Sequence, residues 1–247
     1  MALSSSDSKP SDLVSIIIPF YNCSYIGNSI ASALQQTYNN IEIIVVDDGS
    51  TAHLQSVKPF LSQIVYIKKT NGGTASALNK GFKIAKGNYM VWLSSDDIML
   101  PDKIEKQLKF MKKEKAAFSF TDYKLINDKN ENLTASGILS SYSRESILDG
   151  LKTNCTINGS TIMMKRDLFA SVGVFDTSYR YAHDYEYWIR AYLKHDLAFL
   201  KEPLTFYRIH NRMGTKKHLR KISEETDRIQ KQYGHILNNF HGWKRAK

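Results

Sequence analysis

Two adjacent carboxylates, Asp96 and Asp97, follow an apolar run near the middle of this 247-residue sequence. Residues 89–93 (Tyr-Met-Val-Trp-Leu) have the length and composition of a buried parallel strand. Ligands of open α/β sheets bind just beyond the carboxyl ends of the strands. Because burying an unpaired carboxylate is costly and hard cations take oxygen ligands, the pair indicates a divalent cation and the diphosphate that it holds. A solvated acidic loop is the alternative interpretation.

A second apolar run upstream also ends on paired carboxylates. Residues 41–46 are rich in β-branched side chains, as strands are, and Asp47 and Asp48 follow them directly. Gly49 and Ser50 predict a turn and then the N-cap of a helix. This second acidic strand end favours the ligand-binding interpretation over the solvated loop, because the ends of parallel strands meet at a common edge.

A third predicted strand ends in polar groups that are not acids. Residues 14–18 form the strand, and Pro19 is expected to end its pairing because proline has no backbone N–H. Tyr21 and Asn22 then lead into a helix whose apolar positions repeat at helical spacing over 26–34. The three strand ends together predict one nucleotide-binding rim.

A glycine-rich turn, Asn71-Gly72-Gly73, lies between the two acidic strand ends. Backbone can approach a ligand closely at such a turn, and the helix that follows Thr74, its expected N-cap, offers free N–H groups to an anion. An ordinary tight turn explains the segment taken alone. The pattern matches neither the P-loop nor the dinucleotide-binding fingerprint, which argues against an ATPase and a nicotinamide enzyme.

The three strand ends and the glycine-rich turn belong to a series of short motifs that follow one another along the sequence. The series consists of Pro-Phe-Tyr-Asn at 19–22, Val-Val-Asp-Asp-Gly-Ser at 45–50, Asn-Gly-Gly at 71–73, Asn-Lys-Gly at 79–81, Ala-Lys-Gly at 85–87 and Leu-Ser-Ser-Asp-Asp at 93–97. It resembles the motifs of the family 2 inverting glycosyltransferases, with a match that covers residues 14–210. The resemblance implies the GT-A fold, an α/β arrangement with a mixed, Rossmann-like sheet flanked by helices, and nucleotide-diphosphate sugars as donors.

The resemblance also implies roles for individual residues. It assigns contacts with the nucleotide and the donor sugar to Pro19, Tyr21, Asn22, Asp47, Asp48, Asn71, Gly73, Asn79, Asp96 and Arg208. It assigns the divalent metal, Mn²⁺ or Mg²⁺, to Asp97 and His210. The sequence departs from the family pattern at Ser94, where members often have Asp, so the division of roles between Asp96 and Asp97 is open.

The catalytic base is expected at Asp184, in the segment His-Asp-Tyr-Glu-Tyr-Trp-Ile-Arg at 183–190. Apolar positions at helical spacing predict a helix here, and its dipole favours an ionised acid near the N-terminus. An ordinary N-terminal acid is the alternative for the segment alone, but the family carries its base at this position of an acidic-pair motif. His183 replaces the first acid of that motif, and it either tunes the site or is simply exposed.

A predicted strand at 203–210 ends in Arg208 and His210. Arginine pairs well with phosphate and imidazole is a competent metal ligand, whereas a single histidine at a strand end is often structural or exposed. In related enzymes a histidine at this place completes the metal site and closes over the diphosphate. The loop at 211–215 is accordingly a candidate lid that orders on donor binding.

Length and composition favour a cytoplasmic enzyme with one substantial core. We expect a disordered lead-in at 1–12, a catalytic domain at 13–215 divided into a nucleotide-sugar half (13–122) and an acceptor half (123–215), and a basic amphipathic helix at 216–247. No apolar run is long enough to span a membrane, and the first residues lack the core of a signal peptide. Two cysteines are too few for a disulfide framework.

The net charge of +10 favours anionic partners such as nucleic acid, anionic lipid or an anionic glycan. No zinc-finger or RNA-recognition signature accompanies the charge, so we expect no nucleic-acid partner. The helix at 216–247 either packs on the domain or docks peripherally on the inner face of the membrane.

We therefore expect an inverting hexosyl- or N-acetylhexosaminyl-transferase in cell-envelope polysaccharide biosynthesis. Its donor would be a UDP-sugar, with a dTDP-sugar next, and its acceptor a hydroxyl of a glycan or lipid-linked sugar. Such a reaction needs one base for the attacking hydroxyl and one cation for the departing diphosphate. Two other hypotheses are a non-catalytic nucleotide-sugar-binding scaffold, which would lack the base or the metal ligands, and a sugar nucleotidyltransferase. The latter would carry a glycine-rich loop with Arg and Lys where Pro19 stands.

Overall fold

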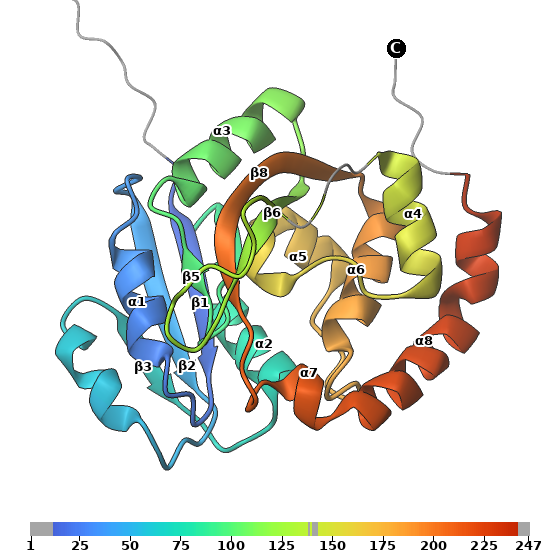
Figure 1. Ribbon diagram of the computed structural model, residues 1–247. Helices are drawn as coiled ribbons and strands as arrows, with labels where there is room; N and C mark the ends of the chain where they lie inside the picture. The colour runs from blue at the N-terminus through green and yellow to red at the C-terminus, as the bar shows by residue number, and fades with distance from the viewer. Residues whose placement is uncertain (1–11, 138, 140–142, 242–247) are drawn as a thin grey trace, which may run out of the picture.

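An eight-stranded sheet with helices on both faces forms the body of the protein (Figure 1). The structure is a computed structural model that describes residues 12–137, 139 and 143–241. The expected lead-in at 1–12 lies outside the described residues except for Asp12, and so does the end of the predicted basic helix, 242–247.

The helices and strands follow the order of the predicted motifs. The strands are β1 (Val14–Phe20), β2 (Ile41–Asp47), β3 (Val65–Lys68), β4 (Tyr89–Trp92), β5 (Ile98–Met99), β6 (Phe118–Ile126), β7 (Ile162–Lys165) and β8 (Leu197–Arg208). The α-helices are α1 (Ile26–Leu34), α2 (Thr74–Ile84), α3 (Lys103–Glu114), α4 (Arg144–Thr153), α5 (Arg166–Val172), α6 (His183–Lys194), α7 (Gly214–Lys217) and α8 (Leu219–Asn239). Short 3₁₀ turns lie at Leu54–Ser56, Lys58–Phe60 and Gly159–Thr161.

The sheet is mixed, as predicted, with the strand order β3-β2-β1-β4-β7-β6-β8-β5. The first four strands of this order run parallel, β7 is antiparallel to β4 and β6, and β8 is parallel to β6. The chain moves outward from β1 through β2 to β3 and then returns to β4 on the other side of β1. Open α/β sheets bind ligands at such a reversal, so the ends of β1, β2 and β4 should form the site.

Pro19 does not end the first strand, contrary to the expectation from its missing N–H. Strand β1 continues to Phe20, and Pro19 pairs with Val46 of β2. On the other side of β1, pairing with β4 stops at Ile17, whose carbonyl accepts the N–H of Leu93. Backbone polar groups of residues two apart in a strand point to the same side. The nitrogen of Pro19 therefore points to the same side as the carbonyl of Ile17, toward the neighbouring position where β4 has already ended. An N–H at position 19 would have no β4 acceptor in any case, so proline costs the sheet no hydrogen bond here.

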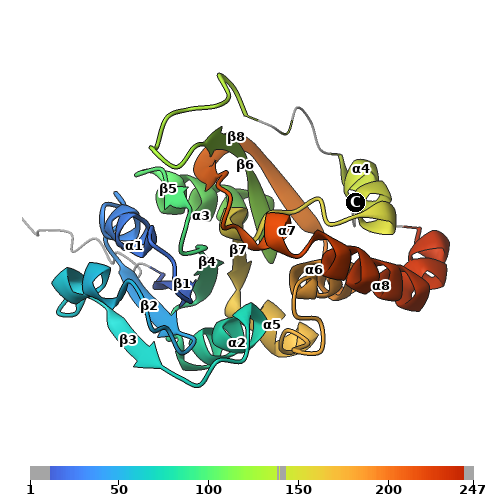
Figure 2. The same cartoon turned by 60° about the horizontal axis from the view of Figure 1, so that its bottom comes forward.

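Side chains alternate along the central strands and divide the core into two layers. Ile16 and Ile18 of β1 pack in the layer that contains α1 and α3, whereas Ile17 packs in the layer that contains α2, α4, α5, α6 and α8. Figure 2 shows α1 and α3 on the opposite side of the sheet from α2 and α5. Because both faces are covered, the central strands β1, β2 and β4 are mostly apolar, and these apolar runs predicted them from the sequence.

The turn after β2 differs from the predicted helix start. Ser50 donates its backbone N–H to Asp47 at 2.6 Å, and its hydroxyl accepts the N–H of Asn22 at 3.1 Å. The next elements are two 3₁₀ turns, Leu54–Ser56 and Lys58–Phe60, in place of an α-helix. Ser50 therefore joins the ends of two strands and does not cap a helix.

The basic C-terminal helix packs on the domain. Ile229, Tyr233 and Leu237 of α8 lie at helical spacing and are buried in the layer of α4 and α6, whereas Leu219 and Ile236 are exposed. Within the described residues, none of the helices combines the length and the apolar character that crossing a bilayer requires. Packing accounts for the apolar stripe that the sequence shows in this helix.

Lys103, at the start of α3, is a fully buried cation for which the described residues provide no ion pair. Its Nζ donates to Gln107 Oε1 at 2.7 Å, and burial lowers the pKa of Lys103 to about 7. We expect Lys103→Met to raise the free energy of unfolding at pH 7 by about 1–3 kcal/mol, because burying the charge costs more than the lost hydrogen bond contributes. Urea denaturation at pH 7 measures the change.

The same substitution should alter how stability depends on pH. Between the folded pKa of about 7 and the unfolded value of roughly 10.4, the unfolded chain binds a proton at Lys103 that the folded chain does not. Unfolding free energy therefore rises with pH across this window in the wild type, and Lys103→Met removes that part of the slope. Lys109→Met, at an exposed position of the same helix, is the control. Equal slopes in the wild type and Lys103→Met would contradict the prediction.

Candidate active site

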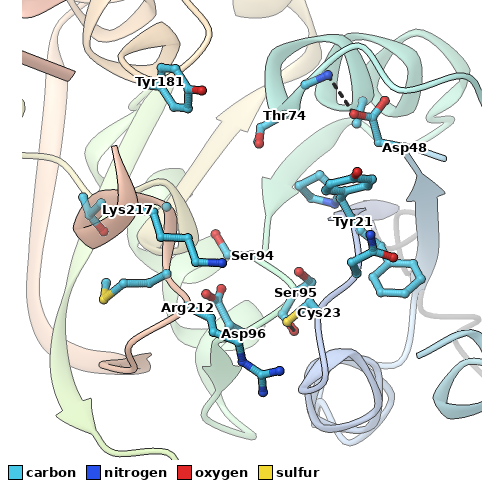
Figure 3. Close-up of a pocket in the computed structure, with 18 of the residues that line it drawn as sticks. Tyr21, Cys23, Asp48, Thr74, Ser94, Ser95, Asp96, Tyr181, Arg212 and Lys217 are labelled. Carbon is cyan, nitrogen blue, oxygen red and sulfur yellow. Dashed lines mark hydrogen bonds between the residues drawn. The ribbon is translucent and has the colours of Figure 1, made fainter. Parts of the chain in front are cut away.

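A cavity of about 750 Å³ opens at the carboxyl ends of β1, β2 and β4. Figure 3 shows Tyr21 and Asp48 on one wall, Tyr181 and Lys217 on the opposite wall, and Asp96 between them. The volume is typical of small-molecule sites. The predicted site residues that line it are Pro19, Tyr21, Asn22, Asp48, Asn71, Gly73, Asp96 and His210. The cavity therefore lies where the three strand ends predicted a rim.

Asp48 holds the glycine-rich turn. Its carboxylate accepts the backbone N–H groups of Gly72 at 3.0 Å and Gly73 at 2.7 Å, and Lys69 Nζ lies 2.6 Å away. Gly73 has a φ of +87°, a conformation that glycine adopts without a steric penalty, and it occupies the N-cap position expected for Thr74. Because Asp48 accepts these two N–H groups, they are not free for a phosphate.

Asn22 and Tyr21 shape the neighbouring wall. Asn22 has a φ of +49°, in the left-handed region that asparagine tolerates, and its Oδ1 accepts the N–H groups of Thr51 and Ala52, each at 2.8 Å. These bonds attach the loop after β2 to the end of β1. The Tyr21 side chain stays 55% exposed and offers an aromatic face on which a flat ligand could stack.

Asp96 and His210 form the pair best suited to a divalent cation. His210 Nε2 lies 3.1 Å from Asp96 Oδ2, and both side chains line the cavity. Carboxylate oxygen and imidazole nitrogen are both ligands of divalent metals such as Mn²⁺. Across the described residues, no group of three or more His, Cys, Asp or Glu side chains could hold a metal by itself. The pair therefore fits a cation that takes its other ligands from a diphosphate and water.

Asp97, the predicted metal ligand, lies behind the cavity wall. Its side chain is fully buried, Oδ2 accepts the Ser160 hydroxyl at 2.5 Å, and Oδ1 accepts the N–H of Arg208 at 2.9 Å. Burial, and then the charge of Asp96, raise the pKa of Asp97 well above its usual range. Both oxygens already accept hydrogen bonds within the protein, and the side chain does not line the cavity, so Asp97 is not placed to hold a cation there.

Arg208, predicted to contact the donor, also lies behind the wall. It is fully buried, and its guanidinium donates to the carbonyl oxygens of Asp96 at 2.7 Å and Asn127 at 2.8 Å. The same group lies 4.3 Å from the centre of the Tyr25 ring. Arg208 therefore supports the backbone of Asp96 and is not placed to touch a diphosphate.

Two more predicted donor contacts, Asp47 and Asn79, also belong to the framework. Asp47 is fully buried and accepts the Ser50 N–H and the Tyr66 hydroxyl. The Asn79 side chain exchanges two hydrogen bonds of 2.8 Å with the backbone of Phe175. Neither residue lines the cavity. Their bonds tie β2 to its turn and α2 to the segment that precedes α6.

His183 lines the cavity, which excludes its interpretation as an exposed residue. It is the first residue of α6, is only 6% exposed, and packs beside the rings of Trp92 and Phe175. Burial lowers the pKa of His183, while the charges of Asp184 and Glu225 oppose that shift. A neutral imidazole can both donate and accept a hydrogen bond, which suits it to a sugar hydroxyl.

Asp184, the predicted base, is a partly exposed acid of the first turn of α6 and is not among the residues that line the cavity. Its Oδ1 accepts the N–H of Tyr185 at 2.8 Å, and Oδ2 lies 3.6 Å from Cys155 Sγ. Burial, and then the charge of Asp184, raise the pKa of Cys155 well above its usual range, so the thiol stays protonated and donates to the carboxylate. Asp184 thus lies beside the cavity, next to His183.

Three cationic side chains without a role assigned from the sequence, together with His218, complete the wall: Arg180, Arg212 and Lys217. Arg180 donates to Asn71 Oδ1 and Arg212 to Ser24 Oγ, each at 3.0 Å. Such a group of cations suits the charge of a diphosphate. In the sequence, Arg212 lies within the 211–215 loop and the others lie close to that loop or to the 183–184 pair. Because isolated cations are common in loops, this position alone did not predict a role for them.

A switch-point cavity with an acid–imidazole pair and a cationic wall places the protein among the α/β proteins that bind small ligands beyond the carboxyl ends of their strands. The model of glycosyl transferase family 2 matches residues 15–173, more than half of the chain. The protein belongs to this family of glycosyltransferases and has the GT-A fold.

Similar proteins support the assignment. An uncharacterised glycosyltransferase of Rickettsia prowazekii is 40% identical over 223 residues, which are 88% of this chain and 70% of the relative. The UDP-Glc:alpha-D-GlcNAc-diphosphoundecaprenol beta-1,3-glucosyltransferase WfaP of Escherichia coli is 37% identical over 81% of this chain and 78% of its own length. A mannosyltransferase of Pyrobaculum calidifontis, solved with GDP-Man and Mn²⁺, superimposes with a TM-score of 0.66 at 15% identity, over 93% of this chain and 65% of that one.

Proposed function

We propose that this glycosyltransferase inverts the anomeric centre as it moves a sugar from UDP to an acceptor hydroxyl. The observation that carries the proposal is the Asp96–His210 pair, 3.1 Å apart in the cavity that also holds Tyr21 and Arg212. The nucleobase could stack on Tyr21, the diphosphate could pair with Arg212, and the cation could bind the Asp96–His210 pair, all within one cavity. A UDP-sugar is the favoured donor because WfaP is named for UDP-Glc, with dTDP-sugars next.

Asp96 and His210 would hold the divalent cation, Mn²⁺ or Mg²⁺. When bound, such a cation supplies Lewis-acid stabilisation of the charge that develops on the diphosphate. Arg212 and Lys217 add positive charge from the segment between β8 and α8. Arg208 lies behind the cavity wall, and its hydrogen bond to the Asp96 carbonyl fixes the backbone that carries the Asp96 carboxylate.

Asp184 would act as the general base. The acceptor hydroxyl loses its proton to the carboxylate as it attacks the face opposite the departing nucleotide, and attack from that face inverts the configuration. The Cys155 thiol donates to one carboxylate oxygen and leaves the acid partly exposed for the acceptor. An acceptor that enters beside His183 would reach both the sugar and the base.

The acceptor is proposed to be a hydroxyl of a glycan or lipid-linked sugar in cell-envelope polysaccharide synthesis. The name of WfaP specifies a lipid-diphosphate-linked GlcNAc, which supports an acceptor of this class. Exposed Leu219 lies among Lys217, Arg220 and Lys221 at the start of α8, a combination that suits peripheral contact with an anionic membrane surface. The proposed location is the cytoplasmic face of that membrane.

Thermal denaturation with UDP tests the proposal. UDP with Mn²⁺ should raise Tm by several degrees at a concentration 100-fold above its Kd, because such binding adds about 2.7 kcal/mol to the unfolding free energy. We expect a much smaller shift when EDTA replaces the metal. Uridine with Mn²⁺ is the control, because it keeps the ring and lacks the diphosphate.

The same measurement with dTDP, GDP, CMP and ADP ranks the nucleotides. An equal shift for UDP in Mn²⁺ and in EDTA would contradict the metal site. A larger shift with GDP than with UDP would replace the proposed donor, and no shift with any nucleotide would contradict the proposed nucleotide site.

A further inference from the structure

One stripe of α8 contacts the segment 178–182, which leads into α6. Figures 1 and 2 both show α8 running beside α6. The contacting residues are spaced three and four apart, so they share one face of α8. They are the N-cap residue His218 and, within the helix, Lys221, Glu225, Arg228 and Gln232. The segment that they contact contributes Arg180 and Tyr181 to the cavity wall and continues directly into His183 and Asp184.

Glu225 is the centre of this stripe. Its Oε1 accepts the N–H of Arg180 at 2.9 Å, and its Oε2 accepts the N–H groups of Tyr181 and Ala182, each at 2.8 Å. Three consecutive backbone donors thus end on one carboxylate that comes from a different helix. Hydrogen bonds to a carboxylate are roughly twice as strong as those between neutral groups, so these three bonds form a strong polar link between the two segments.

Side chains above and below Glu225 add contacts to the same segment. His218 lies with its ring centre 4.4 Å from that of Tyr181. On the other side, Arg228 lies 4.0 Å from the centre of the Tyr179 ring, and the Tyr179 hydroxyl donates to Gln232 at 2.7 Å. The stripe therefore holds both ends of the segment.

The start of α6 has one local hydrogen bond from backbone to side chain, from the N–H of Tyr185 to Asp184, and lacks the one that an N-cap side chain would add. Ala182 occupies the N-cap position, has no side-chain acceptor, and makes no capping bond. Ser, Thr, Asp or Asn would normally provide that acceptor locally. Here an acid from α8 accepts the backbone N–H groups that precede the helix, so the position of His183 and Asp184 depends on α8.

We propose that Glu225 is a positioning residue for the reaction, fixing the segment 180–182 and through it the Asp184 carboxylate. This inference rests on the proposed function, since it takes Asp184 as the base. Glu225 does not line the cavity and touches no reacting atom. Its effect would therefore fall mainly on turnover, because most of the proposed nucleotide partners, such as Tyr21, Asp96 and His210, lie on other segments, and Arg180 is the one member of the cationic wall on this segment.

Glu225→Ala tests the proposal, with Glu224→Ala as the matched control. Glu224 is the preceding residue of the same helix and lies mostly exposed, and its one ion pair among the described residues is with Arg220 on its own helix. Because a misplacement of about 1 Å can cost 10²-fold in rate, we expect kcat of Glu225→Ala to fall roughly 10- to 100-fold. The Kd for UDP with Mn²⁺ should change less than about threefold. Glu225→Gln keeps one acceptor oxygen, so it should recover part of the lost kcat.

Hydrogen–deuterium exchange of the peptide that contains 180–182 provides a readout that needs no turnover. Its amides should exchange faster in Glu225→Ala and at the wild-type rate in Glu224→Ala. Unchanged exchange, or unchanged kcat in a Glu225→Ala protein with the wild-type fold, would overturn the proposal. A wild type that neither binds a nucleotide nor transfers a sugar would instead refute the proposed function, while exchange would still report on the Glu225 contact.

Discussion

Asp184→Asn is expected to abolish sugar transfer and to leave nucleotide binding close to that of the wild type. An amide cannot accept the proton of the attacking hydroxyl, and loss of a positioned general base typically costs ~10²–10⁴-fold in rate. Asparagine keeps the size of the side chain and can still accept the N–H of Tyr185, so the start of α6 should stay intact. Nucleotide affinity should also persist, because Asp184 does not line the cavity.

The measurement is kcat with the donor selected by thermal denaturation, alongside the Kd for the nucleotide and metal. Asp167→Asn is the matched control, since Asp167 is an exposed acid in the first turn of α5, a helix in the same layer as α6. We expect this variant to retain full activity. A turnover of Asp184→Asn within threefold of the wild type would remove Asp184 from the role of base and direct attention to His183, its neighbour in the cavity wall.

Asp96→Asn should remove the metal-dependent part of nucleotide binding, whereas Asp97→Asn should mainly lower stability. Asp96 lies in the cavity 3.1 Å from His210, and Asp97 is fully buried with both oxygens hydrogen-bonded inside the protein. Loss of an outer hydrogen-bond partner of a metal ligand already costs ~10- to 100-fold in metal affinity, so loss of the ligand itself should cost at least as much. His210→Ala should resemble Asp96→Asn for the same reason.

The test compares Tm with and without UDP and Mn²⁺ for the three variants. Asp96→Asn and His210→Ala should keep a Tm near that of the wild type without ligand and lose the metal-dependent shift. Asp97→Asn should start from a lower Tm and keep the shift, because the substitution disturbs buried hydrogen bonds to Ser160 and Arg208. The opposite pattern, in which only Asp97→Asn loses the metal dependence at a native Tm, would return the metal to Asp97.

The sequence by itself was sufficient for the class of fold and for the edge of the sheet at which the cavity opens. Strands covered on both faces are mostly apolar, so β1, β2 and β4 stand out as short apolar runs, and the residues after them must lie at one edge of the sheet. For that reason Tyr21, Asp48 and Asp96 were predicted at the cavity and are found there. The extent of β1 could not be predicted in the same way, because the fate of Pro19 depends on where a neighbouring strand ends.

Only the tertiary structure decided which polar residue of each motif faces the cavity. Asp47 and Asp48 are adjacent, as are Asp96 and Asp97, yet only Asp48 and Asp96 line the cavity. Asp47 and Asp97 are fully buried and accept hydrogen bonds from distant segments, such as those of Tyr66 and Ser160. A sequence motif does not record those partners, because they come from residues far away along the chain. The same holds for the cationic wall and for Glu225 of α8, which accepts the backbone N–H groups in front of the predicted base. Local patterns determine where strands end, and long-range packing determines what each side chain at those ends can reach.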